Sequence, residues 1–250
     1  MSQEEFGTLA FEVMRRVFEI RQEFGRFFEE KIYKRELARR LPGVALEVPV
    51  DVIFQSFSKR YFLDAVYQES ALFEFKMAEA IVARHRAQTL HYLFVGGLGH
   101  AKLVNLRPEV VEHEFVNTTL RPEDRLRFSI QIDRWNAAVP GAQRVEEVLV
   151  ALLRDFGVGL ELSLYEEAIT HFLGGEADVL QEVEIVSAGT SLGHQRLRLC
   201  APSVAFKLTA LPDHLEVFED QARRLLQHTR LDALLWINLT LERVTFTTIQ

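Results

Sequence analysis

The switch from helical to strand periodicity near residue 44 is the feature that most constrains how this chain can fold. Apolar residues recur at helical spacing over residues 3–24, and a second helical stretch begins after Gly25 and closes at Pro42-Gly43. A further helical pattern covers residues 81–95. The strand-like segments are residues 44–54, 60–68, 71–77, 100–107 and 111–118. This order of elements predicts an α/β unit with a mixed sheet and helices packed against it.

The second half of the chain repeats the pattern of the first. Residues 157–173 match residues 25–41 in their order of apolar and polar positions. The matched single positions are Tyr33 with Tyr165, Lys76 with Lys207, Gln88 with Gln221 and Asn105 with Asn238. Each pair is about 130 residues apart, which indicates an internal duplication. Shared α/β patterning without a common origin is the alternative.

The repeat predicts three parts. Residues 1–118 form the first unit, and residues 143–250 form the second. Residues 119–142 behave as a connector, with prolines and a glycine as punctuation. Within the connector, residues 126–132 alternate between apolar and polar side chains, so we expect a strand-like segment there.

Composition favours an ordinary globular protein. Hydrophobic residues make up 48% of the chain and charged residues 26%, and no apolar run approaches the length of about 18 residues that spans a bilayer. The net charge of -7 argues against tight, non-specific binding of nucleic acid. Most of the excess acid lies after residue 125, so a phosphate-binding surface is expected in the first half.

Cys200 is the only cysteine, which excludes an intrachain disulfide and a cysteine-based zinc site. The first residues are acidic and amphipathic, without a basic segment or cleavage site, so we expect no secretion signal and a cytoplasmic location. Three histidines, His85, His91 and His100, lack a metal-binding spacing and are expected to be solvated or part of the core.

Four residues of the first half are candidates for chemistry: Glu30, Asp64, Glu74 and Lys76. Glu74 and Lys76 are two residues apart on one expected strand, so their side chains point to the same side. Asp64 lies across the expected hairpin, where its carboxylate can approach that of Glu74. Glu30 interrupts an apolar helix stripe. That stripe consists of Phe27, Tyr33, Leu37 and Leu41.

Two carboxylates at one place need a cation between them, or one of them must take up a proton. Mg²⁺ suits such oxygen ligands because it uses few carboxylates and keeps waters and substrate phosphates in its shell. A neighbouring lysine helps to position or deprotonate an attacking water and offsets charge that grows on a phosphate. The same spacing also occurs on solvated strand faces, which is the alternative for these residues.

The spacing Asp64-x9-Glu74-Phe75-Lys76 resembles the D-x(n)-(D/E)-x-K signature of PD-(D/E)XK nucleases. Residues 7–118 resemble, more narrowly, the bacterial proteins named for their GxxExxY motif. The supporting segments are Glu30-Lys31-Ile32-Tyr33, Ala78-Glu79-Ala80, His85-Arg86-Ala87-Gln88, Tyr92-Leu93 and Lys102-Leu103-Val104-Asn105. Gln88 and Tyr92 have the spacing of the QxxxY element of RecB-like nucleases. One departure is Phe27, which stands where the family has glycine.

The resemblance implies a restriction-endonuclease-like fold and a set of roles. Asp64, Glu74 and the backbone carbonyl of Phe75 would hold Mg²⁺ or Mn²⁺. Glu30 would complete the acidic cluster directly or through water. Lys76 would serve the attacking water, and Gln88 would orient a ligand or phosphate from the following helix.

The second half, residues 143–249, is expected to be a degenerate copy of this unit. Leu162 stands where Glu30 would be, and Ala205 where Glu74 would be. The segment facing the expected Asp64 position, residues 194–199, has no acidic residue. Lys207 alone cannot hold a divalent cation, so this copy is expected to lack a metal site.

The sequence therefore predicts a metal-dependent nuclease with one active site in the N-terminal copy. Nucleic acid is the expected partner, with DNA favoured over RNA, and no membrane association is expected. The two copies would form an intramolecular pseudo-dimer, as a monomer or a weak homodimer. The alternative is a catalytically inactive binding module for nucleic acid or protein that retains the nuclease fold.

Overall fold

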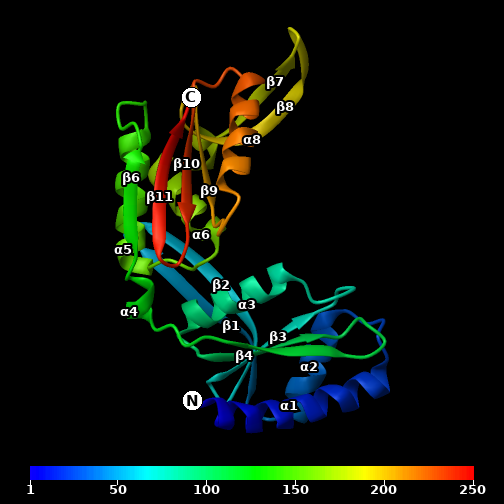
Figure 1. Ribbon diagram of the computed structural model, residues 1–250. Helices are drawn as coiled ribbons and strands as arrows, with labels where there is room; N and C mark the ends of the chain where they lie inside the picture. Colours follow the sequence, from blue (N-terminus) through cyan, green and yellow to red (C-terminus); the bar gives the residue numbers. More distant parts are fainter. The chain divides into compact units, whose positions relative to one another are not determined.

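The computed structural model describes residues 1–250, and the chain divides into two compact units, Met1–Leu120 and Arg121–Gln250 (Figure 1). Each unit is a mixed β-sheet flanked by helices, so the predicted α/β class is confirmed. No helix in either unit is both long enough and apolar enough to cross a bilayer.

Unit 1 has the predicted order of two helices, three strands, one helix and two strands. Its elements are α1 (Gln3–Phe24), α2 (Glu30–Arg40), β1 (Val44–Phe54), β2 (Phe57–Tyr67), β3 (Ala71–Lys76), α3 (Ala83–Gly96), β4 (His100–Asn105) and β5 (Glu112–Asn117). The sheet order is β1-β2-β3-β4-β5. Strands β3 and β4 are parallel and every other neighbouring pair is antiparallel, because helix α3 provides the crossover between them.

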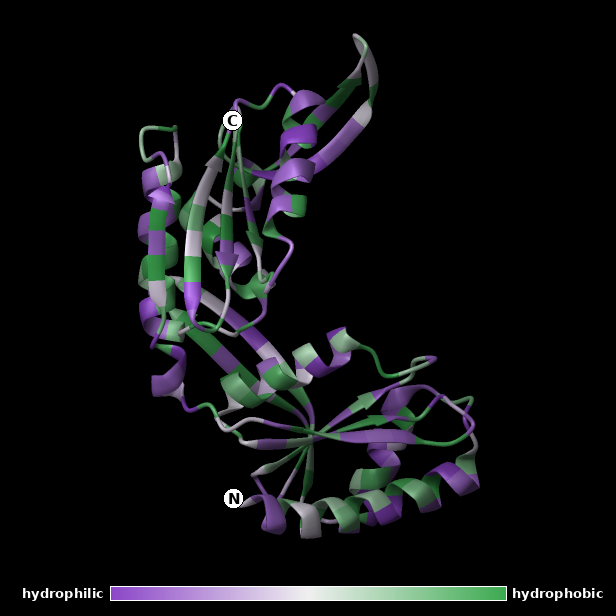
Figure 2. Cartoon of the chain, in the orientation of Figure 1, coloured by the Kyte–Doolittle hydropathy of each residue, from purple (hydrophilic) through white to green (hydrophobic).

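Helices cover both faces of this sheet. A reciprocal pair of hydrogen bonds between Ser2 and Glu5 caps the start of α1, and its apolar side packs with α2 on one face. Figure 2 shows hydrophobic and hydrophilic residues alternating around α1, as expected of an amphipathic helix. Phe6 and Phe73 stack in this core, and each fully buried large side chain contributes about 1.5–3 kcal/mol. Helix α3 packs on the opposite face through Leu93.

The start of α2 differs from the expected apolar stripe. Phe27 precedes the helix and is 91% exposed, so its assignment to the buried stripe is wrong. Tyr33 and Leu37 are buried as predicted. The hydroxyl of Tyr33 donates to the carbonyl of Gly25, and Gly25 has a φ of 72°, which an L-residue adopts at a cost. The chain therefore turns outward between α1 and α2 and leaves Phe27 in solvent.

Unit 2 adds one edge strand and two short helices to the same order of elements. Its elements are α4 (Pro122–Arg125), β6 (Ser129–Arg134), α5 (Ala142–Phe156), α6 (Leu162–Phe172), α7 (Glu176–Val179), β7 (Leu180–Ser187), β8 (Thr190–Ala201), β9 (Val204–Thr209), α8 (Leu215–Gln227), β10 (Ala233–Leu239) and β11 (Arg243–Ile249). The sheet order is β6-β11-β10-β9-β8-β7. The strand-like segment of the expected connector is β6, which pairs with β11 and so belongs to the sheet of unit 2.

The two units share their strand order and also two hydrogen-bonding arrangements in which a side chain holds a backbone segment, which we call braces. The hydroxyl of Tyr165 donates to Gly157, as that of Tyr33 does to Gly25. A second brace uses an asparagine side chain that bonds both the N–H and the C=O of one backbone residue. Asn105 makes this pair of bonds to Ala78, and Asn238 makes it to Leu211.

The parallel strand pairing corrects one matched position. In unit 1, Lys76 pairs with Asn105, whereas in unit 2 the residue paired with Asn238 is Thr209. Lys207 lies two residues earlier, in the position that Glu74 has in unit 1. The comparison of the two halves matched Lys207 to Lys76. The strand register instead places Lys207 at the position of Glu74, so a base stands where unit 1 has an acid.

We expect the two asparagine braces to be equivalent in energy. Replacing Asn105 or Asn238 with alanine leaves a backbone N–H and C=O without their partners, which lowers the free energy of unfolding of the affected unit by about 2 kcal/mol. Urea unfolding of each variant measures the loss. Asn117→Ala is the matched control, because that side chain is exposed and bonds only His100 among the described contacts. A loss in Asn105→Ala alone would contradict the equivalence.

Candidate active site

The candidate site lies where strands β2 and β3 separate. Their backbone pairing ends at Ala65 and Phe73. Beyond that pair, the N–H of Phe75 donates to Oδ2 of Asp64 at 2.8 Å. The side chain of Asp64 therefore takes over a backbone partner that a continued ladder would supply. The sequence prediction that Asp64 lies opposite Glu74 across the hairpin agrees with this register.

Lys34, a residue that the sequence analysis did not select, joins three of the carboxylates. Its ammonium lies 2.8 Å from Oδ1 of Asp64, 2.5 Å from Oε1 of Glu47 and 3.2 Å from Oε1 of Glu30. The side chain of Lys34 is only 7% exposed. Burial opposes the charged form, but the hydrogen bonds to Asp64 and Glu47 outweigh it and raise the pKa of Lys34. Lys34 is thus a charged ammonium held by its neighbours.

Glu47 reaches this lysine from a strained backbone. It lies in β1 between the pairs Leu46–Ala65 and Val48–Leu63, directly across from Asp64. Its φ is 51°, in the left-handed region, which costs of order 1–3 kcal/mol for a residue other than glycine. The residue with this backbone conformation is also the one whose carboxylate pairs with Lys34.

Glu74 is the most buried acidic group of the site, at 1% exposure. One carboxylate oxygen, Oε1, accepts from Nζ of Lys76 at 2.6 Å, and the other, Oε2, has no hydrogen-bond partner. Burial and the nearby charge of Asp64 raise the pKa of Glu74 to about 8. A buried carboxylate oxygen without a donor is costly, and a cation beside it would remove that cost.

The two remaining predicted site residues, Glu30 and Gln88, lie on helices. Glu30 begins α2, and burial together with the charge of Asp64 raises its pKa. Gln88 donates from its amide to the hydroxyl of Tyr92 at 3.0 Å, within α3, and no described hydrogen bond joins it to the acidic cluster. The structure therefore brings Glu30, Asp64, Glu74 and Lys76 together and leaves Gln88 apart from their hydrogen bonds.

The net negative charge of the acidic cluster would attract a divalent cation, but its carboxylates do not point to one common position. Four carboxylates, from Glu30, Glu47, Asp64 and Glu74, surround two lysines, Lys34 and Lys76. When all six groups are ionised, an excess of negative charge remains. No three acidic, histidine or cysteine side chains of the chain converge as the ligands of one ion do. The groups best placed to hold a metal are Asp64 and the unpartnered Oε2 of Glu74.

Unit 2 has the opposite charges at the corresponding helix and strands. Glu166, next to Tyr165 on α6, stands where Lys34 stands next to Tyr33. Its two carboxylate oxygens each lie 3.0 Å from a base, Nζ of Lys207 and Nη1 of Arg198. This site has one acid and two bases, so it has no cluster of carboxylates for a cation.

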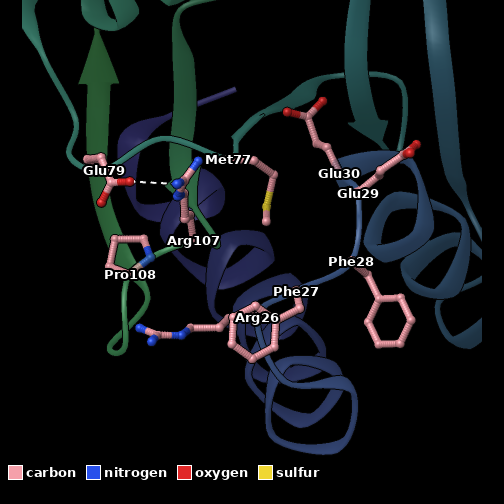
Figure 3. Close-up of a pocket in the computed structure, with 9 residues that line it drawn as sticks. All are labelled: Arg26, Phe27, Phe28, Glu29, Glu30, Met77, Glu79, Arg107 and Pro108. Atoms are coloured by element: carbon pink, nitrogen blue, oxygen red, sulfur yellow. Dashed lines mark ion pairs between the residues drawn. The ribbon is translucent and has the colours of Figure 1, made fainter.

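A cavity of about 580 Å³ opens beside Glu30 (Figure 3). Met77 lies between Glu30 and Arg107 in this view, and Arg107 forms an ion pair with Glu79 at 2.6 Å. Phe27 and Arg26 form the lower wall in the figure. The cavity adjoins the acidic cluster through Glu30 alone among the cluster's residues.

Two comparisons found proteins that are similar to this chain. Residues 8–117 match the sequence family described as the PD-(D/E)XK nuclease superfamily. Among solved structures, the chain is similar to one titled "Crystal structure of SSO0001", with 15% sequence identity, 42% of this chain covered and a TM-score of 0.29. The match spans 62% of that protein's length. No curated protein matches the chain.

We expect Lys34→Met to destabilise unit 1 by about 3 kcal/mol, because it leaves three carboxylates without their shared ammonium. Added Mn²⁺ should raise the melting temperature of this variant more than that of the wild type, since the ion then meets no competing ammonium. Thermal unfolding in EDTA and in Mn²⁺ measures both effects. Lys31→Met is the control, because that lysine is exposed on the same helix and pairs only with Glu29. Equal Mn²⁺ effects in both variants would refute the competition.

Proposed function

We propose that unit 1 is a divalent-metal-dependent nuclease domain that hydrolyses phosphodiester bonds, with DNA as its substrate. The observation that carries this proposal is the orphaned Oε2 of buried Glu74 beside Asp64 and Lys76. The match of residues 8–117 to the PD-(D/E)XK nuclease superfamily supports it. The narrower assignment to GxxExxY proteins is also part of the proposal, and it rests on Glu30, Tyr33 and the segments around them.

The chain supplies most of the required chemistry through fixed charges. Asp64 is held in place by the N–H of Phe75 and by Lys34, so its carboxylate is oriented before any ligand arrives. Asp64, Oε2 of Glu74 and the carbonyl of Phe75 would hold the metal, with Glu30 acting directly or through water. Bound Mg²⁺ or Mn²⁺ would polarise the phosphate and lower the pKa of a water.

Lys76 is the residue proposed to act on the attacking water. Its ammonium is bonded to Oε1 of Glu74 and is only 17% exposed, so its position is defined. With a cation held at Oε2 of Glu74, Lys76 would keep its bond to Oε1 of the same carboxylate. It would orient the attacking water and offset the charge that grows on the phosphate oxygens. Gln88 would join the site only after its amide leaves Tyr92.

We further propose that unit 2 is a degenerate copy of unit 1. The shared strand order and the tyrosine and asparagine braces support a common origin. The reversed charges at Glu166 and Lys207 make it inert toward a divalent cation. One active site per chain then cuts one strand at a time, so nicked circles should appear before linear product.

A second candidate function is a non-catalytic binding module with the same fold. The position of Lys34 favours it, because its ammonium already pairs with Asp64 and Glu30, two of the carboxylates that a metal would need. Under this alternative, Lys34 replaces the metal and the fold retains only a binding surface.

The test is Mn²⁺ calorimetry followed by nicking of supercoiled plasmid. The wild type should bind Mn²⁺ and nick the plasmid, and the isosteric double variant Asp64→Asn/Glu74→Gln should lose both activities, with nicking reduced at least about 100-fold. Asp51→Asn is the matched control, since it changes an acid of the same hairpin that pairs with exposed Arg60. Absence of metal binding and nicking in folded wild-type protein would favour the binding module.

A further inference from the structure

The cavity beside Glu30 has an exposed aromatic wall that is rigidly held. Phe27 is 91% exposed, a large apolar surface to leave in water. The segment that carries it is anchored at both ends by one hydroxyl, because Tyr33 donates to Gly25 at 2.8 Å and accepts from the N–H of Phe28 at 3.4 Å. An exposed ring on an anchored segment can stack with a flat ligand without first losing loop freedom.

A guanidinium without an ion pair accompanies this ring. The Arg26 guanidinium lies 5.5 Å from the ring centroid of Phe27 and has no described hydrogen bond or ion pair. The other charged groups of the lining are already paired. Arg107 pairs with Glu79, while the carboxylates of Glu29 and Glu30 pair with lysines of α2. Arg26 is thus the group of this cavity that is free to meet an anion.

The opposite wall is also fixed in position. Arg21, near the end of α1, donates to the carbonyls of Leu106 and Pro108 at 3.0 and 2.9 Å. These two bonds hold the turn after β4, which carries Arg107. With a volume of about 580 Å³, the cavity is within the range of sites for small ligands. It offers a flat apolar face, one free cation and rigid walls.

We propose that this cavity binds an unpaired nucleotide of the substrate strand next to the bond that is cut. The base stacks on Phe27, and one phosphate pairs with Arg26. This inference rests on the proposed nuclease function, because Glu30 links the cavity to the acidic cluster. Both faces of a base inside a duplex are covered by its neighbours, so a base on Phe27 must be unstacked. The substrate is therefore a single strand or a duplex with an unpaired segment, such as the openings that negative supercoiling favours in a plasmid.

Binding in EDTA tests the proposal without cleavage. The probes are a fluorescein-labelled oligodeoxythymidine of about 12 nucleotides and a duplex of the same length, followed by fluorescence anisotropy. The single strand should bind more tightly than the duplex. Phe27→Ala should weaken single-strand binding about 10-fold, because stacking of one base is lost, and Phe27→Tyr should restore it. Duplex binding should change little.

Arg26→Ala gives an independent measurement. Loss of one phosphate contact should reduce the slope of log K against log salt for the single strand by about 0.7, whereas Phe27→Ala should leave this slope unchanged. Phe11→Ala is the matched control, because Phe11 is 75% exposed on α1 and does not line the cavity. Equal effects of Phe27→Ala and Phe11→Ala, or equal affinity for single strand and duplex, would overturn the proposal.

The outcomes also separate this inference from the nuclease proposal. If plasmid nicking depends on Asp64 and Glu74 while Phe27→Ala binds single strands like the control, the nuclease stands and the cavity assignment fails. If Phe27→Ala selectively loses single-strand binding while the wild type never nicks DNA, the nucleotide cavity stands and the nuclease fails.

Discussion

The buried ammonium of Lys34 is the interaction on which the arrangement of the candidate site depends. Three carboxylates from a helix and two strands converge on it, and none of those acids would tolerate such proximity without a cation. The same ammonium fixes Asp64, and the other oxygen of Asp64 receives the N–H of Phe75. Lys34 therefore connects the point where β2 and β3 separate, the position of Asp64 and the strained backbone of Glu47.

Comparison with unit 2 separates the features that both units need in order to fold from those that only a cation site needs. Glu166 takes the helix position of Lys34 and finds two bases on the strands, so a buried charge is again paired, with the signs reversed. The fold requires compensation of the buried charge but not a particular sign. A cation site additionally requires a local excess of carboxylates. Only the arrangement around Lys34 and Glu74 provides that excess, together with an oxygen that lacks a donor.

The sequence predicted the elements well because periodicity reports burial directly, and it predicted Glu74 with Lys76 because a strand places alternate residues on one side. Lys34 carried a usable signal, since it lies four residues after Glu30 on a helix. Glu47 carried none, because it falls on the more exposed side of an alternating strand and is 54% exposed, like an ordinary surface acid. The match of Lys207 to Lys76 failed for a related reason: residue identity does not define strand register, which only the pairing with Asn238 revealed.

The acidity of the whole chain and its proposed substrate are compatible because charge acts locally. At physiological salt, exposed charges more than about 8 Å apart are largely screened, so the net charge of -7 matters less than the groups that face a phosphate. Around the cavity, ion pairs already compensate Glu29, Glu30 and Glu79. Arg26 then gives a locally positive approach to an otherwise acidic site. A substrate held by one stacked base and one guanidinium needs no broad basic surface, and for that reason an unpaired strand fits this protein better than an intact duplex.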